Sequence, residues 1–214
     1  MGYSRICNDD YYLLWDSDTV PVKKIDLFDD DRRPYFDYKH EYHKPYFDTI
    51  KRLFPQITKQ IKGSFIAEHM IICTQYMQNL LQSIESNNNV KGADYIEKII
   101  NAVDVSELPG SGFSEFETYG SFVLYNYPDR YRLREWRSLR FGGLFFDEAD
   151  KLHDRELQWL ARSYDAVSFE KKDSVSWISK YLTSLEKFFD ATALDYLSIP
   201  IRGFRKMKDL CKSH

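Results

Sequence analysis

The chain has 214 residues, 43% of them hydrophobic, which supplies enough apolar mass for one domain with a sizeable core. Its formal net charge of −3 argues against a general nucleic-acid-binding protein, because such proteins need a basic surface. The cysteines Cys7, Cys73 and Cys211 are too widely spaced for a zinc motif and too few for a disulfide framework, as is usual in a reducing compartment. The sequence shows no secretory signal and no membrane-spanning apolar stretch, so we expect a cytoplasmic protein.

The first part of the chain shows strand and helix patterns in turn. Residues 11–15 are a short aromatic and apolar run, which predicts a buried strand. Residues 29–45 mix charges, aromatics, histidines and prolines without a period, which predicts a long surface loop. From Tyr46 to Ile61 apolar residues recur at helical spacing, and residues 65–73 then predict a strand that a polar pair interrupts.

The pattern continues through the second part. Thr74 is a suitable N-cap for a helix that residues 86–89 end, and a further amphipathic helix is predicted over residues 93–103. The sequence Ser-Glu-Phe-Glu from Ser114 is a capping-box pattern and predicts a helix to about Asn126. The remaining predictions are a strand pair or loop at 137–146, a helix capped by Asp154 and a strand at 166–169. Alternating strands and helices predict an α/β sheet protein rather than a bundle or a sandwich.

Residues 171–214 differ from the rest of the chain. Apolar residues at helical spacing predict a helix, and lysines and arginines follow Pro200, so we expect a helical, basic C-terminal appendage. Packing of this helix on the domain, or on a second subunit in a homo-oligomer, is the interpretation we favour. The alternative is peripheral contact with an anionic membrane at the inner membrane surface, where lipid-linked acceptors reside.

Two aspartates follow the first predicted strand, in the sequence Asp16-Ser17-Asp18. Alternate side chains of a strand point the same way, so both carboxylates could address one ligand. Oxygen ligands of this type suit Mg²⁺ or Mn²⁺, which share them with phosphates, and ligands of open α/β sheets gather at the carboxyl ends of strands. A solvated turn is the usual explanation of such a pair alone. The apolar strand before it and the Thr-Val-Pro-Val sequence after it favour a binding site.

Residues 12–22, Tyr-Leu-Leu-Trp-Asp-Ser-Asp-Thr-Val-Pro-Val, resemble the metal-binding DxD segment of GT-A glycosyltransferases. The runs Lys-Pro-Tyr-Phe-Asp at 44–48, Ser-Phe-Ile-Ala-Glu-His-Met at 64–70 and Ser-Glu-Phe-Glu-Thr-Tyr-Gly at 114–120 add to this resemblance. Together they look like an uncharacterised bacterial glycosyltransferase-like family of domains of unknown function. The resemblance implies a partial GT-A-like catalytic domain over residues 1–170, with a mixed or parallel sheet flanked by helices.

The resemblance also implies a function. A sugar would pass from a nucleotide-sugar donor to a glycan or lipid-linked acceptor in polysaccharide biosynthesis, with Asp16 and Asp18 holding Mn²⁺ or Mg²⁺ and the donor diphosphate. Arg137, one of a cluster of arginines at 130–140, is our candidate for neutralising that diphosphate, since arginine binds phosphate bidentately. For any single arginine of this cluster, an ion pair at the surface is the structural alternative.

Acidic residues further along are candidates for catalysis and substrate binding. Glu115 or Glu117 would be the general base that removes the proton of the acceptor hydroxyl, at a position similar to the acidic motif of inverting GT-A enzymes. As alternatives, both acids could stabilise the helix N-terminus, and Glu117 could complete the capping box, so we favour Glu115 as the base. Glu68 and His69 are either substrate-binding residues or a hydrogen-bonded core pair, and Tyr119 is assigned to the substrate.

One departure from the resemblance affects activity. Only fifteen residues precede Asp16, so the N-terminal nucleotide-binding half of a GT-A domain is truncated in this chain. On this interpretation the chain is a truncated reading frame, a fragment, or a subunit that another polypeptide completes, and the activity of the isolated chain is an open question. A missing half-sheet would leave an open strand edge, which favours association. A non-catalytic interaction protein with a degenerate glycosyltransferase scaffold is the second interpretation, and a metal-dependent phosphohydrolase is a third.

Overall fold

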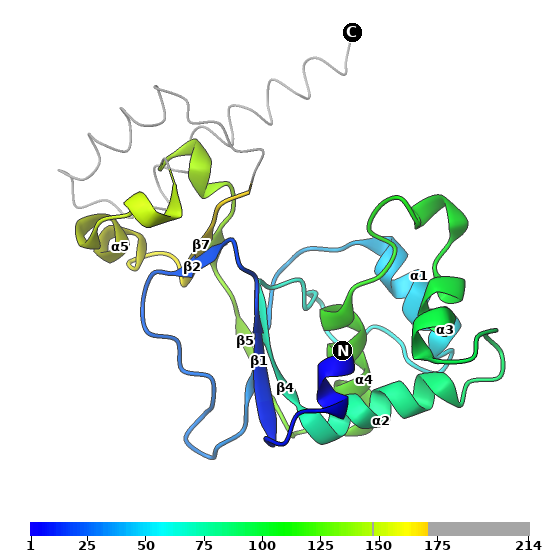
Figure 1. Ribbon diagram of the computed structural model, residues 1–214. Coiled ribbons are helices and arrows are strands. Elements are labelled where there is room, and N and C mark those ends of the chain that lie inside the picture. The colour runs from blue at the N-terminus through cyan, green and yellow to red at the C-terminus, as the bar shows by residue number, and fades with distance from the viewer. Residues whose placement is uncertain (147, 171–214) are drawn as a thin grey trace, which may run out of the picture. The chain divides into compact units, whose positions relative to one another are not determined.

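The computed structural model describes residues 1–146 and 148–170, which fall into two compact units (Figure 1). The first unit comprises Met1–Asp16 and Asp26–Trp136, and the second comprises Ser17–Ile25 and the residues from Arg137 onward. The predicted appendage at 171–214 lies outside the described residues. None of the described helices combines the length and the apolar character that a bilayer crossing requires.

The strands of the first unit form two pairs. Strand β1 (Tyr11–Trp15) runs antiparallel to β4 (His69–Cys73), with Tyr11 opposite Cys73 and Trp15 opposite His69. Strand β3 (Tyr35–Tyr38) runs parallel to β5 (Arg132–Glu135). The helices are α1 (Lys44–Leu53), α2 (Thr74–Glu85), α3 (Tyr95–Ala102) and α4 (Glu115–Asn126), with short 3₁₀ helices at Gly2–Arg5 and Val105–Glu107.

The helices cover one face of the β1–β4 pair. Because successive strand residues point to opposite faces, Tyr12 and Leu14 pack into the core of this unit, whereas Tyr11 and Leu13 remain partly exposed on the other face. The fully or nearly fully buried members of this core include Phe36, Leu53, Phe65, Ile72, Met77, Leu80, Leu81, Ile84, Tyr119 and Val123. Gly120 of α4 lies against the Phe65 ring, where an added Cβ would come within 2.4 Å of a ring carbon.

The second unit has a small mixed sheet of its own. Strand β7 (Ala166–Ser168) lies between β2 (Thr19–Pro21), to which it is antiparallel, and β6 (Ser138–Leu139), to which it is parallel. Helix α5 (Asp154–Leu160) and the 3₁₀ helices Gly142–Leu144 and Ala149–Lys151 complete it. Its core is separate and contains Val22, Leu139, Phe145, Phe146, Trp159, Leu160, Tyr164 and Val167.

The mixed α/β class predicted from the sequence is confirmed, and so are most of the elements. The strand at 11–15, the helices that become α2, α3, α4 and α5, and the strand near 166–169 all form where the sequence patterns predict them. The sheets are small, with two or three strands each, and β1 and β4 are antiparallel. The predicted strand at 11–15 is half exposed rather than buried, because only one of its faces packs against the helices.

Two predicted segments are wrong in part. The predicted loop at 29–45 contains strand β3, whose Phe36 and Asp37 are buried. The helix predicted to run to Ile61 ends at Leu53, because Pro55 follows and the residue before a proline avoids helical dihedrals; Phe54 has φ −141° and ψ 82°.

Two predicted caps are displaced by one residue. Cys73 rather than Thr74 is the N-cap of α2, and the Thr74 hydroxyl donates to the Asp9 carbonyl at 2.6 Å. His153 rather than Asp154 is the N-cap of α5, and its backbone N–H donates to the Glu156 carboxylate at 3.1 Å. In both cases the helix begins one residue earlier than the sequence predicts.

Candidate functional site

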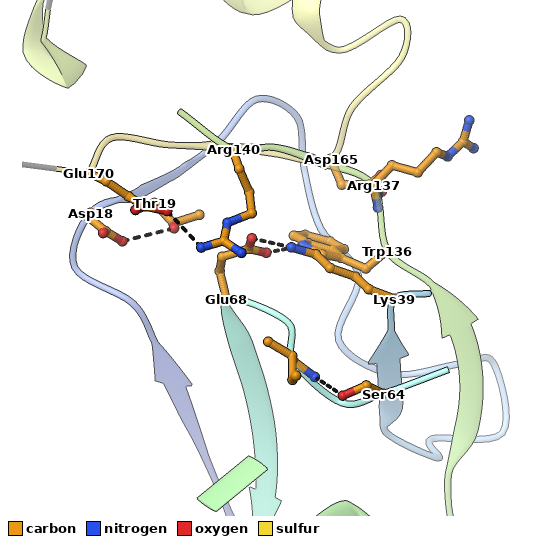
Figure 2. A network of polar contacts seen from close by, with 11 residues as sticks. Asp18, Thr19, Lys39, Ser64, Glu68, Trp136, Arg137, Arg140, Asp165 and Glu170 are labelled. Atoms are coloured by element: carbon orange, nitrogen blue, oxygen red, sulfur yellow. Dashed lines mark hydrogen bonds and ion pairs between the residues drawn. The ribbon is translucent and has the colours of Figure 1, made fainter. Parts of the chain in front are cut away.

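Charged side chains are buried together in the first unit, at one end of strands β3, β4 and β5. Strands β3 and β5 are parallel and end there, whereas β4 begins there, so residues at these positions converge. Figure 2 shows Lys39, Glu68 and Trp136 extending from these strand ends toward one another. We call the following residues the buried charged cluster: Asp37, Lys39, Glu68, His69, Arg134 and Trp136.

Asp37 is the most strongly bound member of the cluster. It lies directly opposite Arg134 in the β3–β5 pairing, and the guanidinium donates to both carboxylate oxygens, at 2.6 and 2.7 Å. Nε2 of His69 lies 2.9 Å from the Asp37 carboxylate. Burial alone would raise the pKa of Asp37, but the hydrogen bonds from Arg134 and His69 outweigh it and lower the pKa. Asp37 is therefore ionised although its side chain is almost fully buried.

Glu68 is bound in a similar way on the adjacent strand end. Lys39 donates from its ammonium group to Oε1 of Glu68, and both side chains are about nine-tenths buried. The Trp136 indole N–H donates to Oε2 at 2.7 Å, as Figure 2 shows. Both carboxylate oxygens are thus used within the protein, which is the condition for burying an ion pair at tolerable cost.

His69 contacts two tryptophan rings, which also contact one another. The Trp15 ring, opposite His69 in the β1–β4 pairing, is tilted by 33° to the imidazole with centroids 4.7 Å apart. The Trp136 ring lies 4.3 Å from the imidazole centroid. Nδ1 of His69 is buried and has no hydrogen-bond partner among the residues that the structure describes. Asp37 accepts from Nε2, so in the neutral ring Nδ1 carries the lone pair.

Asp16 leaves strand β1 at this cluster. Its backbone N–H donates to the Glu68 carbonyl at 2.8 Å, which continues the β1–β4 ladder by one pair, and its carboxylate is exposed. Strand β1 ends at Trp15, and Ser17 and Asp18 form a turn. The strand geometry assumed for the aspartate pair is therefore wrong, because alternation of side chains applies to extended backbone and not to a turn.

Asp18 belongs to the second unit, unlike Asp16. Its side chain is exposed and accepts a hydrogen bond from the Thr19 hydroxyl at 3.3 Å, and its carbonyl accepts from the Phe169 N–H at 2.8 Å. Within the described ranges, no three His, Cys, Asp or Glu side chains are grouped so that they could hold one metal ion.

Glu117 and Glu115, the two candidate bases, differ in environment. Ser114 caps α4 by accepting from the Glu117 N–H at 3.2 Å, but the Glu117 side chain does not complete the capping box. Instead its carboxyl accepts from the Ser64 hydroxyl and from the Phe65 N–H at 2.8 Å. Burial raises the pKa of Glu117 despite these hydrogen bonds. Glu115, in the same helical turn, is exposed.

A surface pocket of about 270 Å³ lies near Glu117. Ser121 lines the pocket, and its hydroxyl is 3.5 Å from the second carboxyl oxygen of Glu117. Tyr42 and Phe47 line another side with stacked rings, over which the Lys59 ammonium lies at 4.7 and 5.0 Å. This pocket brings a ring-stacking surface, a cation and a hydroxyl together on the first unit.

Tyr119, predicted to bind substrate, lies in the core. Its hydroxyl is 2.8 Å from that of Tyr131, and both hydroxyls accept from the Cys73 N–H, at 2.9 and 3.2 Å. Burial raises the pKa of Tyr119 well above its ordinary value. The Tyr119 hydroxyl is engaged at the end of β4, and its ring packs edge-on against Phe36 of β3, so all of these contacts are within the core.

Arg137, predicted to bind the diphosphate, lies in the second unit. Its backbone is fixed to Asp165, which accepts from the Arg137 N–H at 2.9 Å and donates its own N–H to the Arg137 carbonyl at 2.7 Å. The guanidinium makes no hydrogen bond or ion pair with any residue that the structure describes, and Figure 2 shows it pointing away from Asp165. A fixed backbone with an extended, exposed guanidinium is suited to an anionic ligand.

The structure therefore brings together some of the predicted residues but not others. Glu68, His69 and the backbone of Asp16 meet at the buried charged cluster, whereas Glu117 and Tyr119 are engaged elsewhere in the first unit. The sequence predictions omitted Asp37, Lys39, Arg134 and Trp136 from the candidate site. The signal that could have found the first two is the Tyr-Phe-Asp-Tyr run, whose strand-like composition conflicts with a loop.

Comparisons of the chain with known protein families, with curated proteins and with solved structures found no match to any of them.

Proposed function

We propose that this chain is a metal-dependent glycosyltransferase of the GT-A type, which moves a sugar from a nucleotide-sugar donor to a glycan or lipid-linked acceptor. The observation that carries the proposal is the anchoring of Asp16. Its backbone N–H is bonded to Glu68, and the Glu68 carboxylate is itself fixed by Lys39 and Trp136. A carboxylate that leaves such a rigid, buried support is held in place for a ligand, as catalytic ligands require.

In this proposal each residue has a defined task. The Asp16 and Asp18 carboxylates hold Mn²⁺ or Mg²⁺, and the ion, when bound, neutralises the charge of the leaving diphosphate. Arg137 adds a second positive group toward that diphosphate. Glu115 is the better candidate base, because its carboxylate is exposed to an acceptor hydroxyl whereas that of Glu117 is enclosed by Ser64 and Phe65.

Titration calorimetry with Mn²⁺ alone, and with UDP-sugars and GDP-sugars in its presence, tests the proposal. Asp16→Asn keeps the backbone bond to Glu68 and removes only the charge, so it should weaken Mn²⁺ binding by about tenfold or more without loss of fold. Asp18→Asn should do the same. Asp9→Asn changes an exposed carboxylate in the first unit and serves as the matched control. Equal Mn²⁺ affinity in all four proteins would refute the metal site.

A non-catalytic interaction protein is the second candidate, and one observation favours it. Glu68, Glu117 and Tyr119 have their polar atoms engaged by the protein itself, as expected of a scaffold that keeps its fold without turnover. This candidate predicts that the wild-type chain binds neither Mn²⁺ nor a nucleotide-sugar in the calorimetric experiment. It also predicts that Asp18→Asn changes no measurable function.

A further inference from the structure

One edge of strand β1 has no strand beside it among the described residues. The bonds from Thr74 N–H to the Asp10 carbonyl and from Asp16 N–H to the Glu68 carbonyl fix the hydrogen-bonded pairs of the β1–β4 ladder at even-numbered β1 residues. The N–H and C=O groups of Tyr11 and Leu13 therefore point to the opposite edge. The β1–β4 sheet has two strands, so these groups meet no further strand of the described chain.

The side chains of this strand leave the edge open rather than protect it. Edges are usually protected by lysine, by proline or by a bulge, and Tyr11–Trp15 contains no charged residue and no proline. Tyr11 is 37% exposed and Leu13 is 42% exposed, although both are large and apolar. The Phe28 ring packs edge-on against Tyr11 with centroids 5.3 Å apart and is itself 38% exposed. The edge and the adjoining apolar surface together form a template for an added strand.

The charges beside this edge determine which strand it fits. Asp9 and Asp10 precede β1 and Asp16 follows it, and all three are exposed. Arg130 lies near enough to Tyr11 to lower its pKa, although burial raises that pKa overall, so one positive charge offsets part of the acidic group before the strand. The acidic group before the strand, Asp9 and Asp10, therefore keeps a net negative charge.

We propose that the β1 edge binds an extended strand of another polypeptide, one with alternating apolar side chains and with lysine or arginine at the end that lies beside Asp9 and Asp10. The added strand pairs its backbone with Tyr11 and Leu13, and its terminal cations lie beside Asp9 and Asp10. This inference is independent of the transferase proposal, because it uses no metal and no sugar ligand.

A second copy of this chain fits the edge less well. If two β1 strands pair antiparallel about Leu13, Asp10 of one copy lies directly opposite Asp16 of the other. In a parallel pairing each aspartate lies beside its own equivalent. Like charges opposite one another on neighbouring strands are destabilising. A second copy of the chain therefore binds this edge less favourably than a strand that carries basic residues.

A fluorescent synthetic peptide tests the proposal in the full-length chain. The peptide alternates valine and threonine between lysine ends, and a companion peptide carries glutamate in place of every lysine. Anisotropy titration should show the lysine peptide binding at least about tenfold more tightly, with the difference shrinking as salt is raised. Hydrogen exchange at the Tyr11 and Leu13 amides should slow when the lysine peptide is bound, because both amides then donate to it.

Two variants locate the binding to this edge. Leu13→Pro removes an N–H that points away from β4, so the β1–β4 ladder is kept, while peptide affinity should fall by about tenfold or more. Leu13→Lys leaves the backbone unchanged and should also weaken binding of the lysine peptide. This variant tests the site even if the proline variant does not fold. Val105→Lys places the same charge at another exposed apolar position, 79% exposed, and should bind as the wild type does.

Three outcomes would overturn the proposal. The first is equal affinity, or no affinity, for both peptides. The second is wild-type binding by both Leu13 variants. The third is a dimer of the wild-type chain in sedimentation experiments that Leu13→Pro converts to monomer, since a second copy would then occupy the edge. Failure of the Mn²⁺ titrations leaves these peptide results unaffected, so the two proposals fail separately.

Discussion

The two ends of strand β4 satisfy buried polar groups in different ways. At its carboxyl end the Cys73 N–H is bonded to two neutral hydroxyls, those of Tyr119 and Tyr131. At its amino end Glu68 and His69 are bonded to charged groups, the Lys39 ammonium and the Asp37 carboxylate. Both ends belong to one five-residue strand and its flanking residue. Glu68 and His69 are buried, and so are Tyr119 and Tyr131, whereas Cys73 itself is partly exposed.

The comparison shows that the charge of a hydrogen-bond partner, and not only burial, decides how strongly each end depends on it. Removal of a neutral hydrogen-bond partner costs about 1–3 kcal/mol at most when a buried group is left unsatisfied. Removal of one member of a buried ion pair costs about 3–5 kcal/mol, because an uncompensated charge remains in the interior. We therefore expect the amino end of β4 to be the more fragile of the two.

Asp37→Asn should have the largest effect on stability. The amide keeps the size of the side chain but removes the negative charge that both Arg134 and His69 face, so the free energy of unfolding should fall by about 3–5 kcal/mol. Urea denaturation followed by circular dichroism measures this. Asp48→Asn, at an exposed pair with Lys44, is the control and should change stability only slightly.

The same substitution has a pH dependence with a definite sign. The pKa of Asp37 is lower in the folded protein than in the unfolded chain, where it is about 3.9. The stability that this carboxylate contributes is therefore present above about pH 4 and is lost as the pH falls through its folded pKa. The difference between wild type and Asp37→Asn should shrink in acid. A difference that stays constant down to the acid transition would contradict this account.

Tyr131→Phe should have a smaller effect, at the other end of the strand. The Cys73 N–H keeps the Tyr119 hydroxyl as its acceptor, so only one neutral bond is lost and the free energy of unfolding should fall by about 1 kcal/mol. Thermal and urea denaturation measure it, with Tyr125→Phe at an exposed position as the control. A loss as large as that of Asp37→Asn would mean that the two ends do not differ in the way proposed.

Sequence patterns predicted one of these ends better than the other. Glu68 and His69 interrupt an apolar run, and that interruption indicated a buried polar pair with either a functional or a structural role. Tyr119 lies beside an apolar stretch and Tyr131 lies between Arg130 and Arg132, and neither context distinguishes a hydrogen-bonded hydroxyl from a ring that only packs. Their bonds to Cys73 depend on α4 and the segment before β5 meeting β4, which is a tertiary arrangement.

The elements were predicted where local periodicity is strong, as in α2 and α4, and missed where pairing is non-local. Strand β3 pairs in parallel with β5, nearly a hundred residues later, so the only local sign of it is the strand-like composition of Tyr-Phe-Asp-Tyr inside a segment of loop character. Arg134 is a member of the site for the same reason, since its position opposite Asp37 follows from the β3–β5 register. The aspartate pair was identified from its motif, but its turn conformation was not.

Glu117 lies between these two ways of satisfying a buried group, and its substitution should have the smallest effect. Burial favours the neutral form of the Glu117 carboxyl, so its pKa is higher in the folded protein than in the unfolded chain. Below about pH 4.3, its value in the unfolded chain, the group is neutral in both states, and its contribution to stability is fully present. That contribution is lost as the pH rises through the folded pKa.

Glu117→Gln keeps an oxygen that can accept from Ser64 and Phe65 but cannot ionise. The variant should therefore gain stability relative to wild type as the pH rises from about 4 to neutral, which urea midpoints across that range would measure. Glu115→Gln, exposed in the same helical turn, should show no such trend. If both variants followed wild type at every pH, the protein would stabilise the ionised Glu117 carboxylate as fully as it stabilises that of Asp37. Glu117 would then resemble the charged groups at the amino end of β4.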